Sequence, residues 1–211
     1  SSARLQGYLL ERMQLELEMA SLSTDAREGM QSDIAQMDAI IGQFLDYAKP
    51  TETSSFVPVE ISHLLADCAQ HARRLPGMRV STHLEEDVQV LGNEIDLRRV
   101  INNIVENARR YARTPGQDYT ELDFACHVRS TPQGRRAVVE IADHGPGVPD
   151  DQINQLLKPF TRLDTARGQA NGAGLGLAIV ERVVTRHNAE LAVRNREGGG
   201  LLVQLALPLA S

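Results

Sequence analysis

Two asparagines stand at helical spacing in the segment NEIDLRRVINNIVENARRYA (residues 93–112). Asn103 and Asn107 are four residues apart and therefore share one face of a helix, and Arg110 and Tyr111 follow one turn later. Asparagine has a below-average helix propensity, so two on one face need a reason. A carboxamide oxygen is a hard ligand that suits Mg2+, and an arginine suits a phosphate chain. Taken alone, however, this helix favours the simpler interpretation of a polar, solvated face.

A second group of residues, DHGPGVP (143–149), directly follows the apolar segment AVVEIA. A carboxylate at the end of a strand, followed by Gly145 and Gly147, can be presented in a tight loop that a ligand approaches closely. Asp143 could accept a hydrogen bond from an exocyclic amine such as that of adenine. The alternative is an ordinary turn aspartate.

The third group is NGAGLGLAIV (171–180), with Gly172, Gly174 and Gly176 at alternate positions before an apolar run. Such glycines let backbone N–H groups turn toward an anion, and the following helix start adds its positive dipole end. The spacing is neither the Walker pattern nor the dinucleotide fingerprint. Each group is a weak signal, but their order along the chain makes chance a poor explanation.

The composition is that of an ordinary folded protein. Hydrophobic residues make up 42% of the 211 residues and charged residues 24%, so one or two domains with a real core are expected. A net charge of -6 argues against nucleic acid as a partner. Cys68 and Cys126 are expected to be reduced and buried, as in a cytoplasmic protein. No apolar run reaches the roughly 18 residues of a membrane span, so we expect a soluble chain.

Residues 1–50 differ from the rest of the chain. Apolar residues recur at helical spacing in two series over residues 4–48, which predicts a helical hairpin that forms a four-helix bundle on dimerisation. The alternative is a hairpin that packs on its own domain. The segment 51–58, with its proline and Ser/Thr residues, is interpreted as a linker, and 59–211 as a second domain.

Helices and strands alternate in that second domain. Helices are predicted over 59–75, 93–112, 151–157 and after the third glycine group, and strands over 78–84, 88–92, 121–128, 135–143 and in a hairpin within 189–209. The expected fold class is therefore α+β: the helical hairpin, followed by a two-layer α/β sandwich with a mixed sheet covered by helices on one face.

The order of these groups resembles the ATP-binding catalytic domain of sensor histidine kinases, within the nucleotide-binding fold shared with gyrase, Hsp90 and MutL. NIVENARRYA resembles the N box, DHGPGVP the G1 box, KPFTRLD the F box and NGAGLGLAIVERVV the G2 box. DIAQMDAIIGQFLDYA resembles the second helix of a dimerisation and histidine-phosphotransfer domain of the EnvZ and RisS type.

The resemblance implies ATP or ADP with Mg2+ as cofactors. Asn107 would ligate the magnesium, Asp143 would bind the adenine amine, and residues 161–171 would form a lid anchored by Phe160. The nucleotide-binding residues that the resemblance implies are Asn103, Asn107, Arg110, Tyr111, Asp143, Gly145, Gly147, Phe160, Gly172, Gly174, Leu175, Gly176 and Leu177.

Asn103 separates two branches of this superfamily. The ATP hydrolases of the gyrase and MutL type carry a glutamate four residues before the metal-binding asparagine, where it activates water. Asn103 cannot act as a general base, so the resemblance favours a kinase over an ATPase.

The first helix lacks the family's H box, roughly His-Glu/Asp-Leu-Arg-Thr-Pro-Leu. Arg4 occupies the place of the phosphoacceptor histidine, and a guanidinium offers no free lone pair for attack. We therefore expect no catalytic nucleophile and no autophosphorylation at that position. Either the N-terminal segment departs from the natural one, which we favour, or the kinase is naturally degenerate.

The resemblance implies a kinase that moves the γ-phosphoryl of Mg-ATP to a histidine and then to an aspartate of a response-regulator receiver domain. The expected partners are a second copy through residues 4–48 and that receiver domain, without nucleic acid. The parent protein is expected in the bacterial inner membrane through segments outside this chain, with this part in the cytoplasm. A non-catalytic dimeric ATP-binding regulator is the alternative, and an anti-sigma-type serine kinase, which lacks the long hairpin, is a distant third.

Overall fold

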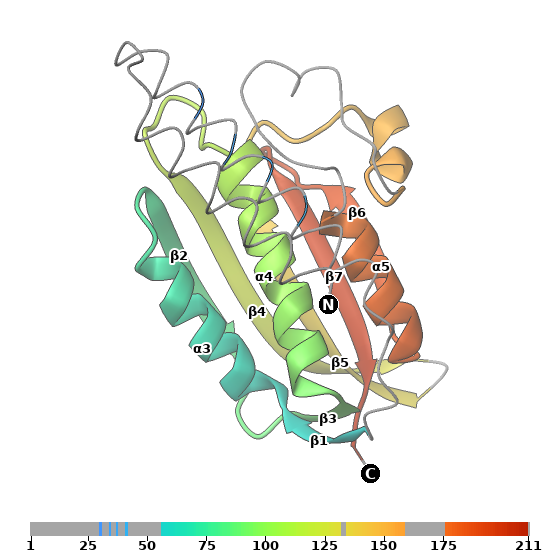
Figure 1. The fold of residues 1–211 in the computed structure, drawn as a ribbon. Helices are drawn as coiled ribbons and strands as arrows, with labels where there is room; N and C mark the ends of the chain where they lie inside the picture. The colour runs from blue at the N-terminus through green and yellow to red at the C-terminus, as the bar shows by residue number, and fades with distance from the viewer. Residues whose placement is uncertain are drawn as a thin grey trace.

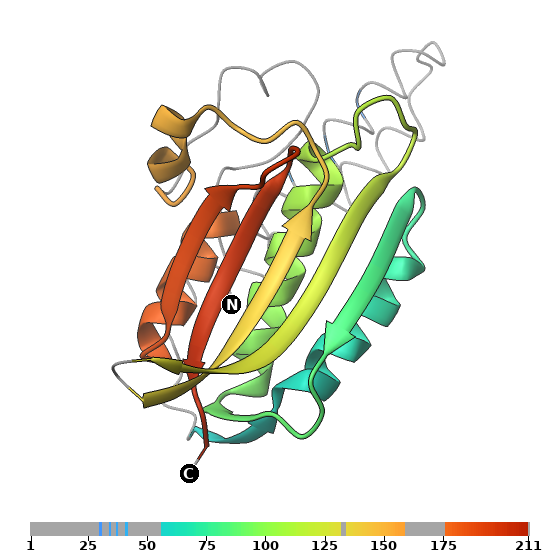
Figure 2. The same cartoon turned by 180° about the vertical axis from the view of Figure 1, so that it is seen from behind.

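A computed structural model describes residues 56–131, 134–158 and 176–210, with the single residues Met30, Ile34, Met37 and Ile41. Three helices cover one face of a five-stranded sheet (Figure 1). From behind, none of the described helices lies on the opposite face (Figure 2). Within the described residues, no helix has the length and apolar character that crossing a membrane requires.

The described elements are, in chain order, β1 Val57–Glu60, α3 Ile61–Arg73, β2 Met78–Leu84, β3 Gln89–Gly92, α4 Glu94–Tyr111, β4 Thr120–Thr131, β5 Gly134–Asp143, the 3-10 helix η1 Asp150–Gln155, α5 Gly176–Arg186, β6 Glu190–Asn195 and β7 Leu201–Pro208. The sheet has the order β2-β4-β5-β7-β6, in which β2 and β4 are parallel and all other neighbours antiparallel. This arrangement confirms the expected two-layer sandwich with a mixed sheet.

The core lies between the sheet and the helices. Alternate residues of β4 point into it, and Leu122, Phe124 and Cys126 are all at most 2% exposed. The apolar face of α4 packs in the same core, which fixes the rotation of this helix about its axis. The asparagines at 103 and 107 are consequently held at partly buried positions beside α5.

The linker prediction was wrong at its C-terminal end. We assigned residues 57–58 to a linker and 59–60 to a helix, but all four form β1, which pairs antiparallel with β3. Backbone pairing and the burial of Val59, which is 6% exposed, account for the strand. Pro58 is tolerated because a two-stranded ribbon does not need every N–H in its ladder.

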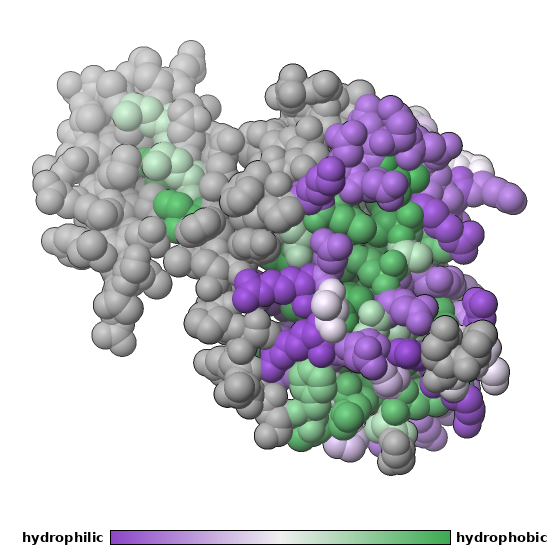
Figure 3. All heavy atoms as spheres, turned by 90° about the vertical axis from the view of Figure 1, so that its right-hand side faces the viewer, coloured by the Kyte–Doolittle hydropathy of each residue, from purple (hydrophilic) through white to green (hydrophobic). Residues whose placement is uncertain are grey.

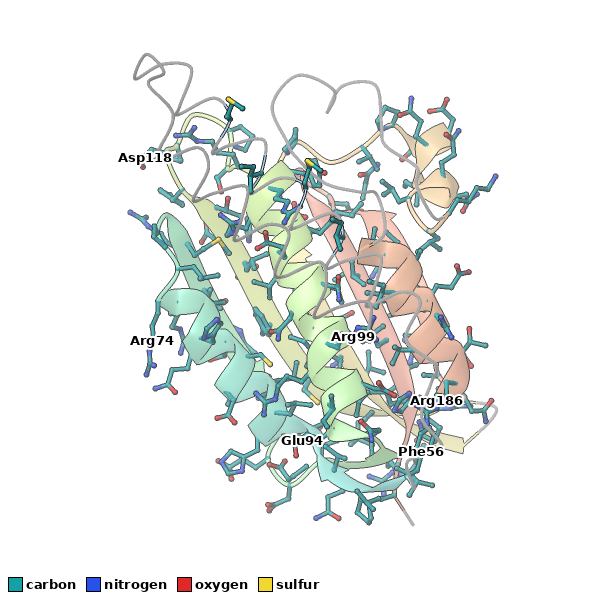
Figure 4. All side chains as sticks on the ribbon, viewed as in Figure 1. Phe56, Arg74, Glu94, Arg99, Asp118 and Arg186 are labelled. Atoms are coloured by element: carbon teal, nitrogen blue, oxygen red, sulfur yellow. The ribbon has the colours of Figure 1, made fainter. Side chains whose placement is uncertain are left out.

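Phe56, just before β1, also belongs to the folded unit. Its ring stacks on the imidazole of His187 at 4.5 Å between centroids, and the guanidinium of Arg186 lies 5.3 Å from its centre. Figure 4 shows Phe56 and Arg186 together at the end of α5. The folded unit therefore includes residue 56, three residues before the predicted domain boundary at residue 59.

Other predictions can be compared directly. A short helix was expected over residues 151–157, and the structure has the 3-10 helix η1 there, over Asp150–Gln155. Cys68 and Cys126 are both free and buried, as predicted, and burial raises the pKa of the Cys126 thiol to about 11. In the predicted hairpin, the four described residues are helical, and the rest of that hairpin lies outside the described residues.

Candidate nucleotide-binding site

The side-chain oxygens of Asn103 and Asn107 face the first residue of α5. The Asn103 amide nitrogen donates a hydrogen bond of 2.8 Å to the carbonyl of Arg99, which directs its oxygen the other way. A Cβ built on Gly176 would lie 3.7 Å from Asn103 Oδ1 and 3.9 Å from Asn107 Oδ1. Two hard oxygen ligands thus converge where α5 begins.

The start of α5 supplies the complementary charge. The first N–H groups of an α-helix lack partners within the helix, and the helix dipole places positive potential there. The amide oxygens suit a cation and the helix start suits an anion, so their juxtaposition fits a metal-bound phosphate.

Asp143 ends β5 as a nearly buried carboxylate, with 9% of the residue exposed. Its Oδ1 accepts hydrogen bonds from the N–H groups of Gly145 (2.9 Å) and Leu201 (3.1 Å). Burial raises the pKa of this carboxyl, although these two hydrogen bonds act in the opposite direction. Because both donors bind one oxygen, Oδ2 is the oxygen that a ligand amine would approach.

Close packing brings the Asp143 loop against the end of α4. A Cβ built on Gly145 would lie only 2.6 Å from the Cα of Ala112, the residue that caps α4. Gly147 has a φ of +71°, and a Cβ there would lie 2.8 Å from Asn195 Oδ1. Both glycines are therefore required by geometry, and Asn107 and Asp143 belong to neighbouring, directly packed segments.

Arg110 is engaged with a residue that we did not single out from the sequence. Its Nε lies 2.7 Å from Oε1 of Glu106, and Arg109 binds the same carboxylate. The hydrogen bond from Arg109, followed by that from Arg110, lowers the pKa of Glu106 despite its burial. Arg110 would exchange this ion pair to reach a phosphate. The i,i+4 spacing of Glu106 and Arg110 was the available signal.

Of the remaining predicted site residues, the structure describes two, and the others lie outside the described residues. Tyr111 is the partly buried last residue of α4. Leu177 is 5% exposed and packs in the core, so its main chain rather than its side chain is available to a nucleotide. The predicted residues that lie outside the described residues are Arg4, Phe160, the lid 161–171, Gly172, Gly174 and Leu175.

The turn between β6 and β7 belongs to the site as well, although we predicted only a hairpin there. Gly200 has a φ of +93°, and a Cβ at this position would collide with the main-chain oxygen of Asp143. Three consecutive glycines, 198–200, were the available signal, because a hairpin turn alone does not require so many.

The donor set agrees with magnesium held together with a phosphate chain. Among the described residues, no group of three or more His, Cys, Asp or Glu side chains is placed to hold a metal ion. Mg2+ commonly binds one or two protein oxygens together with phosphate oxygens and water, so two asparagine oxygens fit this mode. Polar side chains also gather at the end of the molecule where η1 lies (Figure 3).

Comparisons with known proteins agree with this geometry. Residues 92–211 match the family described as histidine kinase-, DNA gyrase B-, and HSP90-like ATPase. The sensor protein CutS of Streptomyces coelicolor is 32% identical over 162 residues, which cover 76% of this chain and 36% of CutS. The chain thus spans about a third of the length of that relative.

Two solved structures extend the comparison. The histidine kinase domain of the E. coli osmosensor EnvZ is 29% identical, with a TM-score of 0.52, over 77% of this chain and 94% of that one. The ATP binding domain of PrrB from Mycobacterium tuberculosis is 27% identical, with a TM-score of 0.55, over 74% and 98%. The chain therefore belongs to the family of histidine kinase-, DNA gyrase B- and HSP90-like ATPases, and among its members it resembles the sensor histidine kinases.

Proposed function

We propose that this chain is the ATP-binding catalytic core of a two-component sensor histidine kinase. The observation that carries the proposal is the convergence of the Asn103 and Asn107 oxygens on the start of α5, beside the loop that holds Asp143. The Asp143 carboxylate suits a purine amine, and the asparagine oxygens at the start of α5 suit a metal-bound phosphate chain.

Each segment has a separate role in this proposal. Asp143 Oδ2 would accept a hydrogen bond from the adenine amine, Asn107 would ligate magnesium with Asn103 beside it, and the α5 N-terminus would bind phosphate oxygens. Bound magnesium would neutralise charge on the phosphates as the γ-phosphoryl group is transferred. The chain itself mainly positions the nucleotide and stabilises charge.

The acceptor would be a histidine of the helical hairpin, and the product would pass its phosphoryl group to an aspartate of a response-regulator receiver domain. Asn103 stands where a hydrolase would need a general base, which supports transfer rather than hydrolysis. We further propose that residues 1–50 form a dimerisation domain and that the parent protein is anchored in a bacterial inner membrane.

Arg4 makes this chain an inactive acceptor in the proposal. We expect that γ-labelled ATP leaves the native chain without acid-labile phosphate. We then expect that restoring the H box produces it, through the combined substitutions Arg4→His, Leu5→Asp, Gln6→Leu, Gly7→Arg, Tyr8→Thr and Leu9→Pro. The same variant with Asn107→Ala is the matched negative control.

The second candidate function is a non-catalytic, dimeric ATP-binding regulator, and Arg4 at the acceptor position is the observation that favours it. Binding of Mg-ATP without any phosphorylation of the restored variant would support this regulator and contradict the kinase. Acid-labile phosphate in the native chain would contradict our assignment of Arg4.

A further inference from the structure

The side chain of Asn195, the last residue of β6, binds main-chain groups of the loop that follows Asp143. Its amide nitrogen donates to the carbonyl of Val148 (2.7 Å) and to Asp150 Oδ1 (2.7 Å), and its oxygen accepts from the N–H of Val148 (3.0 Å). One side chain thus satisfies both the donor and the acceptor of one backbone residue, as a neighbouring strand would. Gly147 packs directly against the same amide oxygen.

Arg196, the next residue, holds the beginning of that loop. Its NH1 donates a 2.8 Å hydrogen bond to the main-chain oxygen of Asp143, and its NH2 lies 3.7 Å from Asp123 Oδ2 on β4. The imidazole of His144 lies 2.7 Å from the same Asp123 oxygen. Arg196 therefore links the main chain of Asp143 to the Asp123 carboxylate on β4, and the His144 side chain contacts the same carboxylate directly.

Asp123 is itself fixed in place. The hydroxyl of Ser81 on β2 donates to its Oδ1 at 2.6 Å. Burial alone would raise the pKa of Asp123, but the hydrogen bonds from Ser81 and His144, with the charges of His144 and Arg196, lower it overall. The carboxylate therefore stays ionised at neutral pH and can anchor both Arg196 and His144.

The turn before β7 completes this support. Leu201 donates its N–H to Asp143 Oδ1, and Gly200 packs on the Asp143 main-chain oxygen. The main chain and one carboxylate oxygen of Asp143 are thus both held from the β6–β7 hairpin, with Asn195 and Arg196 where β6 enters the turn.

We propose that Asn195 and Arg196 are positioning residues that determine adenine specificity, because they aim the free oxygen of Asp143 at the exocyclic amine. This inference rests on the proposed function. Both residues are bound to the loop rather than aimed at the ligand, so they act through the orientation of the Asp143 carboxylate. A hydrogen bond weakens steeply when its angle changes, so a small rotation of the loop would reduce recognition of the amine and leave the phosphates bound.

The test compares Mg-ADP with the diphosphate of purine riboside, which lacks the amine. In Arg196→Ala and in Asn195→Ala we expect ADP to bind about tenfold more weakly, whereas the analogue changes less than about twofold. Arg194→Ala, which removes an exposed arginine from the same strand, is the matched control and should change neither affinity. Arg196→Gln, which keeps one donor for the Asp143 carbonyl, is measured beside them in case alanine lowers Tm.

A double-mutant cycle tests whether Arg196 affects ADP affinity through Asp143. In an Asp143→Ala background, Arg196→Ala should cost less than about twofold, because the oxygen that it positions is absent. Equal losses for both diphosphates, or an undiminished loss in the Asp143→Ala background, would overturn the inference. A native chain that binds neither diphosphate would refute the proposed function, whereas a native preference for ADP that survives in Arg196→Ala and Asn195→Ala would refute this inference alone.

Discussion

At the residue scale, the space beside the α-carbon of Gly176 can hold either a side-chain methyl group or a bound phosphate. Gly176 begins α5 with the amide oxygens of Asn103 and Asn107 opposite its α-carbon, at ordinary van der Waals distance from an added methyl group. Unlike Gly147, it has no positive φ. An alanine is therefore tolerated by the backbone but occupies the side on which a metal-bound phosphate would lie.

We predict that Gly176→Ala lowers the affinity for Mg-ADP about tenfold, which is about 1.4 kcal/mol. Thermal stability should not fall, because alanine favours a helix over glycine. Gly145→Ala is the contrasting control: its methyl group would meet the Ala112 backbone at 2.6 Å, so overpacking should cost about 1–3 kcal/mol of stability and lower Tm. Unchanged nucleotide affinity in Gly176→Ala would contradict the phosphate site.

The residue types and spacing of these positions could be predicted from the sequence, but their interactions could not. The spacing of Asn103 and Asn107 indicates a common helix face, whereas the carbonyl that accepts from Asn103 is visible only in the structure. Asn195 and Arg196 carry no motif, because their role depends on β6 ending beside a loop about fifty residues earlier in the chain.

At the element scale, His187 joins the end of α5 to the start of α4. Its Nε2 accepts from the N–H of Asn93 (3.1 Å), and its Nδ1 donates to the carbonyl of Val183 (2.8 Å). Asn93 in turn caps α4 by accepting from the N–H of Asp96. The neutral tautomer satisfies both ring nitrogens of a residue that is 2% exposed, so this imidazole helps to hold the two helices that form the site.

We predict that the free energy of unfolding falls as the pH is lowered below about 6.5, the ordinary pKa of histidine. Burial, the largest cause, lowers the pKa of His187 in the folded state, with the Arg186 charge acting the same way and the Val183 hydrogen bond and Asp96 charge opposing it. The unfolded chain therefore binds the proton first, so the contribution is complete above pH 6.5 and is lost as the pH falls. Denaturant titrations at several pH values measure this loss.

Two variants test whether this pH dependence of the free energy of unfolding comes from His187. His187→Gln should unfold with a flatter dependence on pH, and His71→Gln, which changes an exposed histidine on α3, should keep the native dependence. The same pH dependence in native protein and His187→Gln would contradict the assignment.

Most helices and strands follow from their periodicity, and β1 shows where that approach fails. The predicted strand 78–84 matches β2, and the predicted helix 93–112 contains α4. β1 has four residues, includes a proline and forms only because β3 lies about thirty residues further along the chain. Local patterns carry no information about such a distant partner.

At the scale of the whole molecule, the described part has a core of its own. All residues of the main hydrophobic cluster lie between Val59 and Leu209. The fold class was predictable because the apolar faces of helices and strands must pack on one another. The strand order β2-β4-β5-β7-β6 was not, because it depends on pairings between segments far apart in sequence.

We predict that the full chain is a dimer and that residues 56–211 alone are a monomer that binds Mg-ADP with native affinity. The expected hairpin of residues 4–48 would bury its apolar face by pairing with a second copy, whereas the main hydrophobic cluster of the described fold lies between Val59 and Leu209. Light scattering of both chains gives the masses. A monomeric full chain, or a dimer of residues 56–211, would contradict this account.

The most direct test is calorimetric titration of Mg-ADP into the native chain, Asn107→Ala and Asp143→Ala, with Asn102→Ala as an exposed control on the same helix. We predict at least about a tenfold loss for Asn107→Ala and for Asp143→Ala and none for the control. Without magnesium, the loss in Asn107→Ala should disappear and that in Asp143→Ala should remain. Native affinity in either site variant would contradict a shared site in which Asn107 binds the metal and Asp143 binds the base.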